Sequence, residues 1–188
     1  SLSRGGADAA EIREFDLVTR EWVAPEDGGF FLPEAKSTMA WIDPDTVYVS
    51  TDFGTAPDGH PSLTESGYPR ITKRWTRGTD LANATTAYAG DYTDVSAGAY
   101  YSSTPGFERH FAARSTDFYN ELSYELNPET GDLTLIEVPT DAHSDPYREW
   151  LFVSPRSPWE LGSTVYEPGS LLVFDYDDFV HAGRREAT

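Results

Sequence analysis

Hydrophobic and polar side chains alternate in short segments along this chain. Residues 121–126 read Glu-Leu-Ser-Tyr-Glu-Leu, so the apolar side chains of an extended segment share one face and the polar ones share the other. This alternation predicts a half-buried strand. The run Asn-Pro-Glu-Thr-Gly-Asp at 127–132 is typical of a hairpin turn, and the apolar segment 133–138 predicts the strand that follows it.

Segments of this kind recur, whereas helical periodicity is hard to find. When Asp16, Arg74, Glu125 and Asp175 are aligned, four related segments lie about 50 to 58 residues apart, a period close to that of propeller blades. These segments cover residues 12–22, 70–79, 121–131 and 170–179. A second set precedes the last three of them, at 46–53, 110–118 and 149–159. The first two members of that set end in Ser-Thr-Asp-Phe.

This recurrence predicts an all-β fold, a partial β-propeller of about four blades of antiparallel four-stranded sheets. The predicted units are 1–35, 36–91, 92–139 and 140–188. Strands are expected at 36–42, 46–53, 70–78 and 85–91 in the second unit, and at 94–102, 109–118, 120–127 and 133–139 in the third. We expect the first unit to lack its opening strands and the last unit to lack its final strand.

Several strings of residues carry a resemblance to a known family. They are REFDL (13–17), GFFLPEAKS (29–37), LTESGYPRITKRWTRGT (63–79), TPGFERHF (104–111), DFYN (117–120) and PGSLLVFDYDDF (168–179). Together they resemble the propeller domain of bacterial serine peptidases of the prolyl oligopeptidase family. The resemblance implies an α/β-hydrolase domain in the same polypeptide, and a seven-bladed propeller that caps the active site and admits only small peptide substrates.

The catalytic residues of that family have no counterpart in this chain. No G-x-S-x-G nucleophile elbow occurs in the sequence, and the catalytic triad of the α/β-hydrolase fold depends on that strand-to-helix turn. We therefore predict no catalytic, cofactor-binding or metal-binding residue and no cofactor. The chain alone is expected to be inactive, while the parent protein is expected to be a peptide hydrolase.

Charge and composition narrow the range of partners. The chain has 32 acidic and 14 basic side chains and a formal net charge of −18, so neither nucleic acid nor an anionic membrane is expected as a partner. Cysteine is absent, which excludes disulfides and permits a reducing compartment. No apolar run reaches the roughly 20 residues of a membrane span, and we expect a cytoplasmic protein. The chain does not begin with Met, so we expect it to be part of a longer one.

Histidine side chains are the first candidates for a catalytic site in this chain. The four histidines are His60, His110, His143 and His181. Ser144, His143 and Asp141 are too close in sequence for a triad, because neighbours on an extended segment point in opposite directions. The histidines are therefore interpreted as solvated loop residues.

Two acidic clusters raise a metal site or a glycosidase carboxylate pair as alternatives. They are Asp43, Asp45 and Asp52, and Asp175, Asp177 and Asp178. Neither has EF-hand spacing, and turn formation is the favoured interpretation. Trp41, just before the first cluster, is expected to be buried at the end of an inner strand.

Two long connections and an alternative function complete the predictions. The 17-residue loop 54–70 and the insertion 157–169 are hypothesised to contact the hydrolase domain or to narrow its entrance.

The alternative function of the chain is that of a free-standing β module that binds a protein or a carbohydrate. Its platform would comprise Tyr100, Tyr101, Trp75 and Trp159. A partial propeller leaves apolar blade faces uncovered, so a homodimer of the isolated chain is also predicted.

Overall fold

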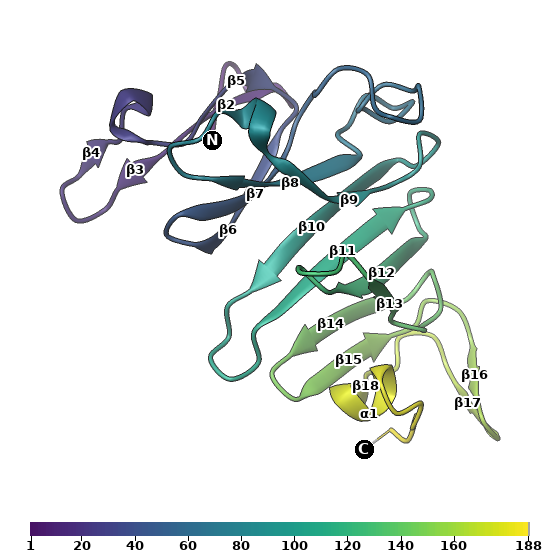
Figure 1. The fold of residues 1–188 in the computed structure, drawn as a ribbon. Helices are drawn as coiled ribbons and strands as arrows, with labels where there is room; N and C mark the ends of the chain where they lie inside the picture. Colours follow the sequence, from purple (N-terminus) through teal and green to yellow (C-terminus); the bar gives the residue numbers. More distant parts are fainter. Residues whose placement is uncertain (188) are drawn as a thin grey trace. The chain divides into compact units, whose positions relative to one another are not determined.

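The structure, a computed structural model, describes residues 1–187. It is built of short antiparallel strands (Figure 1). The chain forms two compact units, Ser1–Tyr100 and the residues from Tyr101 onward, and the division falls inside strand β10, Ser96–Ser102. Among residues 1–187, no helix is long and apolar enough to cross a membrane.

The first unit contains two main sheets and a hairpin. The three-stranded sheet has the order β1-β2-β5, with β1 Leu2–Ser3, β2 Ala10–Arg13 and β5 Phe31–Ala35. The four-stranded sheet has the order β6-β7-β8-β9, with β6 Thr38–Asp43, β7 Thr46–Ser50, β8 Ile71–Thr76 and β9 Thr85–Ala89. The 3-10 turns η1 and η2 cover Pro25–Asp27 and Leu81–Asn83. The strands predicted for residues 36–91 are thus confirmed, in the expected order.

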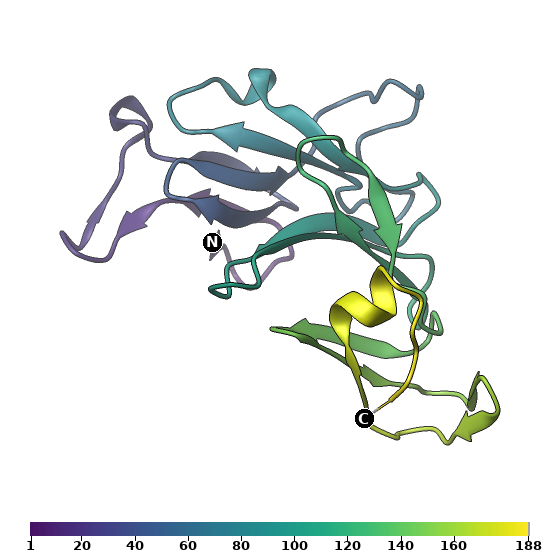
Figure 2. The ribbon, with the colours of Figure 1, turned by 60° about the horizontal axis from the view of Figure 1, so that its bottom comes forward.

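The segment 12–22 was predicted as one element, and this prediction was wrong. The structure divides it into the end of β2 and a hairpin formed by β3, Phe15–Asp16, and β4, Glu21–Trp22. The Asp16 carboxylate accepts hydrogen bonds from the backbone N–H groups of Val18 and Thr19, and this closes the chain into a turn. The hairpin projects from its sheet in both views (Figures 1 and 2).

Strand β7 is the centre of the first unit. All five of its residues are buried, which is typical of a strand covered on both faces. A hydrophobic cluster packs the three-stranded sheet against it, comprising Phe30, Leu32, Val47, Val49 and Trp75. Trp41 departs from its predicted burial and is 49% exposed, because β6 is an edge strand with one paired neighbour in its sheet.

The second unit repeats this arrangement. One sheet has the order β10-β11-β12-β13, with β11 Arg109–Ser115, β12 Glu121–Leu126 and β13 Leu133–Leu135. The next has the order β14-β15-β18, with β14 His143–Tyr147, β15 Trp150–Ser154 and β18 Leu172–Asp175. The hairpin β16 Trp159–Leu161 and β17 Thr164–Tyr166 occupies the predicted insertion. Buried residues from β11, β15, β18 and the segment after β18 form one core cluster.

Several strands in this unit end earlier than predicted, β13 and β18 among them. β13 stops at Leu135, because the chain turns where the Val138 N–H donates to the Ile136 carbonyl at 2.8 Å. β18 stops at Asp175, whose carboxylate accepts a hydrogen bond from Asp178 N–H and caps the short helix α1, Tyr176–Val180 (Figure 2). The antiparallel sheets agree with the predicted propeller architecture, while the number of blades and their boundaries stay a prediction.

Candidate functional site

The long loop 54–70 is a folded element of the first unit. It closes twice on itself through the bridges Thr55↔Pro61 and Leu63↔Pro69. Ser62, between the two closures, is fully buried; its N–H donates to the Gly54 carbonyl at 2.7 Å. A loop packed by its own side chains holds one conformation at little further entropy cost, so this element presents a fixed surface.

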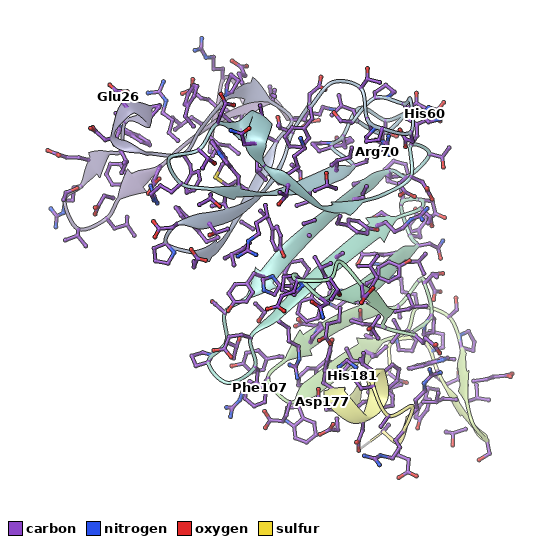
Figure 3. The ribbon with its side chains drawn as sticks, in the orientation of Figure 1. Glu26, His60, Arg70, Phe107, Asp177 and His181 are labelled. Carbon is purple, nitrogen blue, oxygen red and sulfur yellow. The ribbon has the colours of Figure 1, made fainter. Side chains whose placement is uncertain are left out.

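Arg70 fastens the loop from inside. Its side chain is 2% exposed, and its guanidinium donates to the carbonyl oxygens of Pro61 and Gly90, each at 2.9 Å. The third contact is to the Asp58 carboxylate at 2.8 Å, and this hydrogen bond lowers the pKa of Asp58 below its usual range. One buried cation therefore joins the loop to the end of β9 (Figure 3).

The connection between β9 and β10 supports the other side of the loop. Glu65 N–H donates to the Tyr92 carbonyl at 2.8 Å, and the Thr64 hydroxyl donates to the Val95 carbonyl at 3.2 Å. The His60 ring stacks on Tyr92 with 4.7 Å between ring centroids, and His60 is exposed in the loop, as predicted. The outer side of the loop thus offers Asp58 and His60 for contact with another surface.

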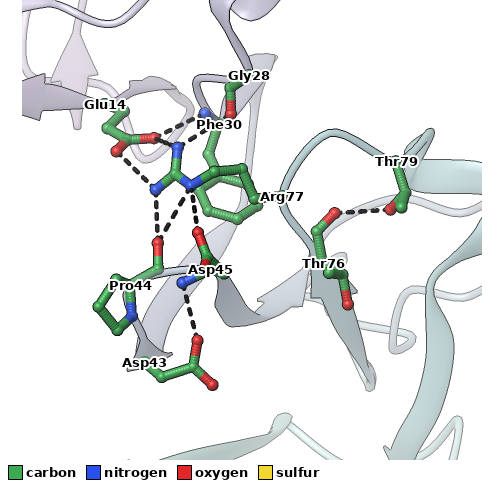
Figure 4. Close-up of polar contacts among 9 residues, drawn as sticks. All are labelled: Glu14, Gly28, Phe30, Asp43, Pro44, Asp45, Thr76, Arg77 and Thr79. Atoms are coloured by element: carbon green, nitrogen blue, oxygen red, sulfur yellow. Dashed lines mark hydrogen bonds and ion pairs between the residues drawn. The ribbon is translucent and has the colours of Figure 1, made fainter.

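A second polar cluster, which the sequence did not reveal, lies around Arg77, just after β8 (Figure 4). Its guanidinium donates to both oxygens of Glu14 at 2.9 Å, and to the carbonyl oxygens of Gly28 and Pro44. The Phe30 ring lies 4.8 Å from the guanidinium carbon. The hydrogen bonds from Arg77 hold the pKa of Glu14 below its usual value. All of these contacts tie the chain together, so the cluster is structural.

The acidic clusters behave as the turn formers predicted from the sequence. The Asp43 carboxylate accepts a hydrogen bond from Asp45 N–H, and the Asp52 carboxylate accepts one from Gly54 N–H, each at 2.8 Å. Asp175 caps α1. Within residues 1–187, no group of three or more histidine, aspartate or glutamate side chains is placed to hold a metal ion.

Two of the four histidines differ from their predicted setting. His110 lies in β11, inside the predicted strand 109–118, and His143 begins β14, a strand that the sequence pattern did not predict, so neither is a loop residue. His181 follows α1, with Nε2 3.2 Å from the Glu125 carboxylate, which also accepts a hydrogen bond from the buried Tyr176 hydroxyl at 2.6 Å. The structure does not assemble Ser144, His143 and Asp141 into a triad: Asp141 instead accepts a hydrogen bond from Ser157.

A hollow of about 500 Å³ lies beside His181 in the second unit. Glu108, His110, Glu125, Glu129 and Asp132 are among its lining residues. Arg109 also lines it, but its guanidinium is already engaged, over the Tyr176 ring at 4.0 Å and on the Arg148 carbonyl at 2.6 Å. Figure 3 labels Asp177 and His181 at this end of the unit. Four of the lining side chains, Glu108, Glu125, Glu129 and Asp132, are carboxylic acids, so the hollow is acidic.

Two of the four aromatic residues predicted to form a binding platform pack against the hydrophobic clusters of their own units instead. Trp75 is buried in the cluster of the first unit, and its indole N–H donates to the Thr79 carbonyl at 2.8 Å. Trp159 packs against the core of the second unit, 5.9 Å from Phe174 between ring centroids. Both indoles therefore contribute to the packing of the fold.

Comparison with known proteins identifies relatives of the chain. No protein-family profile matches it. It is 33% identical to an uncharacterized peptidase of Sinorhizobium fredii over 93% of the chain and 24% of that protein, and 28% identical to an uncharacterized peptidase of Rickettsia prowazekii over 97% of the chain and 26% of that protein. The chain therefore spans about a quarter of the length of these relatives.

Solved structures agree in fold. A post-proline cleaving enzyme from Rickettsia typhi superposes with a TM-score of 0.84 at 24% identity, over 99% of this chain and 28% of that one. The predicted resemblance to the prolyl oligopeptidase family is confirmed. A further structure, from a study of two prolyl endopeptidases, has a TM-score of 0.62 at 19% identity, over 94% of this chain and 24% of that one. In fold, the chain corresponds to the propeller portion of prolyl oligopeptidases.

Proposed function

We propose that this chain is the non-catalytic propeller portion of a serine peptidase of the prolyl oligopeptidase family. Its task is to restrict which peptides reach an α/β-hydrolase active site elsewhere in the same polypeptide. The observation that carries the proposal is the match of nearly the whole chain to about a quarter of two peptidases. The absence of a G-x-S-x-G motif from these 188 residues agrees with a portion outside the catalytic domain.

The proposed selection is steric. A sheet scaffold with fixed connections excludes a bulky substrate by shape, whereas it makes no differential contact with a transition state. The loop 54–70 suits this role, because Arg70 and the bridge pairs hold it in one conformation. The propeller portion then sets specificity and leaves the rate of bond cleavage to the hydrolase domain.

We propose that the four segments 1–35, 36–91, 92–139 and 140–188 are four blades of the propeller. Supporting this, the segments 36–91 and 92–139 each contain a four-stranded sheet in chain order, and the segment 140–188 contains a three-stranded sheet and a two-stranded hairpin. A cytoplasmic location, favoured by the lack of cysteine, stays part of the proposal.

The test replaces residues 56–66 by a short Gly-Ser linker in the full-length peptidase. Turnover of a long peptide is expected to rise relative to a dipeptide-sized substrate, since the entrance widens. Ser62 and Thr64 are buried in this loop, so replacing it also removes packed side chains. The milder substitution Asp58→Asn is therefore tested in parallel. A shortened 127–132 turn, a hairpin connection in the second unit, is the matched control. Equal changes for both substrate lengths would contradict the proposal.

A further inference from the structure

The tetrapeptide Ser-Thr-Asp-Phe occupies the same place in two sheets. In the first unit it spans 50–53, at the end of β7, and in the second it spans 115–118, at the end of β11. β7 and β11 are each the second strand of a four-stranded sheet. In both copies the aspartate closes the turn by accepting a hydrogen bond from the backbone N–H two residues on, at 2.8 Å.

The two phenylalanines differ in what covers them. Phe53 packs against the hydrophobic cluster of the first unit, and Lys73 Nζ lies 4.3 Å from its ring centroid. The 51–70 connection returns to this site, where the Ser62 hydroxyl accepts a hydrogen bond from the Phe53 backbone N–H at 2.7 Å. Phe118, in the equivalent place, is 88% exposed, and the adjacent Tyr119 is 72% exposed. The connection there consists only of residues 116–120, too short to fold back over the rings.

The exposed pair is held rigidly. The Asp117 carboxylate accepts hydrogen bonds from the N–H groups of Tyr119 and Asn120, at 2.8 and 2.9 Å, and from the Asn120 side chain. These bonds lower the pKa of Asp117. Asn120 in turn accepts a hydrogen bond from the Thr140 hydroxyl at 2.7 Å. Two aromatic rings on a fixed turn lose little conformational entropy on association, which favours a contact surface.

We propose that Phe118 and Tyr119 dock onto a part of the peptidase polypeptide outside these 188 residues, and that this part covers the rings as the hydrophobic cluster of the first unit covers Phe53. The inference rests on the proposed function. The relatives are about four times as long as this chain, so most of their polypeptide is available as the partner. A polar recess of about 150 Å³ borders the rings, with Asp141, His143 and Arg156 in its lining. The partner surface is therefore apolar opposite the rings and polar at their edge.

Hydroxyl-radical footprinting tests the contact. Tyr119 is expected to be oxidised at least fivefold more slowly in the full-length polypeptide than in the isolated 188-residue chain. Tyr147, a half-exposed tyrosine in the same unit, is the internal reference and should change less than twofold. Equal oxidation of Tyr119 in the two proteins would overturn the proposal. Protection of Tyr119 that appears when the isolated chain is concentrated would show that the rings contact a second copy of the chain. Protection that appears only when a peptide is added would show that they contact substrate. Either result would also overturn the proposal.

A paired variant gives an independent readout. Phe118→Ser with Tyr119→Ser should leave the Tm of the isolated chain within about 1 °C, since exposed side chains contribute little to stability. In the full-length polypeptide the same change should lower the Tm by several degrees. Unchanged melting of both proteins would contradict docking. Size selectivity for peptides is measured separately, so failure of the gating proposal is distinguishable from failure of this one.

Discussion

Arg77 and Glu14 are 63 residues apart in the chain, and both terminal nitrogens of the guanidinium lie 2.9 Å from the carboxylate oxygens. The pair joins the segment after β2 to the end of β8, and Arg77 also donates to the Pro44 carbonyl in the β6–β7 turn. Two sheets of the first unit are thus connected at one end by a single cation. An ion pair with two hydrogen bonds fixes the relative orientation of the two side chains as well as pairing their charges.

The first prediction concerns this ion pair. Glu14→Gln should lower the free energy of unfolding by about 1–2 kcal/mol at pH 7, because a charge-assisted hydrogen bond becomes a neutral one in a partly exposed setting. The pKa of Glu14 is depressed in the folded state, so its stabilisation is full above its ordinary pKa and is lost as the pH falls through the folded value. Denaturant titrations of wild type and variant should therefore converge at low pH. Glu26→Gln, an exposed neighbour in η1 (Figure 3), should have no effect.

A second prediction concerns the fastening of loop 54–70. Arg70→Met leaves the buried carbonyl of Gly90 and the part-buried carbonyl of Pro61 without their donor, at a cost of about 1–3 kcal/mol for a buried group left unpaired. Hydrogen exchange of the loop amides should accelerate strongly, while β12 in the second unit keeps its protection. Arg74→Met, an exposed arginine in strand β8, which begins directly after Arg70, is the control. Unchanged exchange in the loop would show that the backbone bridges alone hold it.

Tyr176 supplies a third prediction. Burial and the neighbouring Glu125 carboxylate raise the pKa of this phenol far above its usual value. The unfolded chain releases that proton near pH 10, while the folded chain retains it, so the free energy of unfolding falls as the pH rises above about 10. Tyr176→Phe should remove this contribution and flatten the decline. Urea titrations between about pH 9 and 11 measure the difference, and parallel curves would contradict the assigned cause.

Local patterns predicted much of this fold. The alternation in 121–126 and the turn residues after it are short-range signals, and β12 follows them closely. The strand order of the two four-stranded sheets follows from recurrence, because each copy repeats the same sequence of strands and turns. Errors arose where a short side chain redirected the backbone. The Asp16 carboxylate bonds to two nearby N–H groups, and the strand pattern of segment 12–22 did not indicate this turn.

Long-range contacts had no sequence signal. Nothing local in the neighbourhood of Arg77 indicates that Glu14 is its partner, and the burial of Arg70 depends on a loop whose closure is tertiary. Trp41 illustrates the same limit, because its exposure is set by the position of β6 at the edge of a sheet. The Ser-Thr-Asp-Phe repeat was visible in the sequence, yet only the tertiary structure distinguishes the packed Phe53 from the exposed Phe118.

A fourth prediction tests a close approach in the first unit. A Cβ added to Gly90 would lie 2.4 Å from the Ala97 Cβ and 2.9 Å from the Asp94 carboxylate, and both distances are shorter than van der Waals contact. Gly90→Ala should therefore cost about 1–3 kcal/mol. Adding Ala97→Gly should recover part of that loss in a double-mutant cycle. Gly98→Ala, whose new Cβ meets the Thr72 hydroxyl at an ordinary 3.9 Å, is the control, and equal losses at both glycines would contradict steric crowding.

The last prediction concerns association of the isolated chain. A partial propeller leaves apolar blade faces uncovered, and such faces favour self-association. The net charge of −18 opposes it, so the dimer fraction should rise with salt as the repulsion is screened. Light scattering at about 0.05 and 0.5 M salt measures this. Leu17 and Val18, 83% and 92% exposed at the β3–β4 hairpin tip, offer another route to dimers. Changing both to Ser should leave the dimer intact if the blade faces form it; a chain that stays monomeric at high protein concentration in both salts would contradict the prediction.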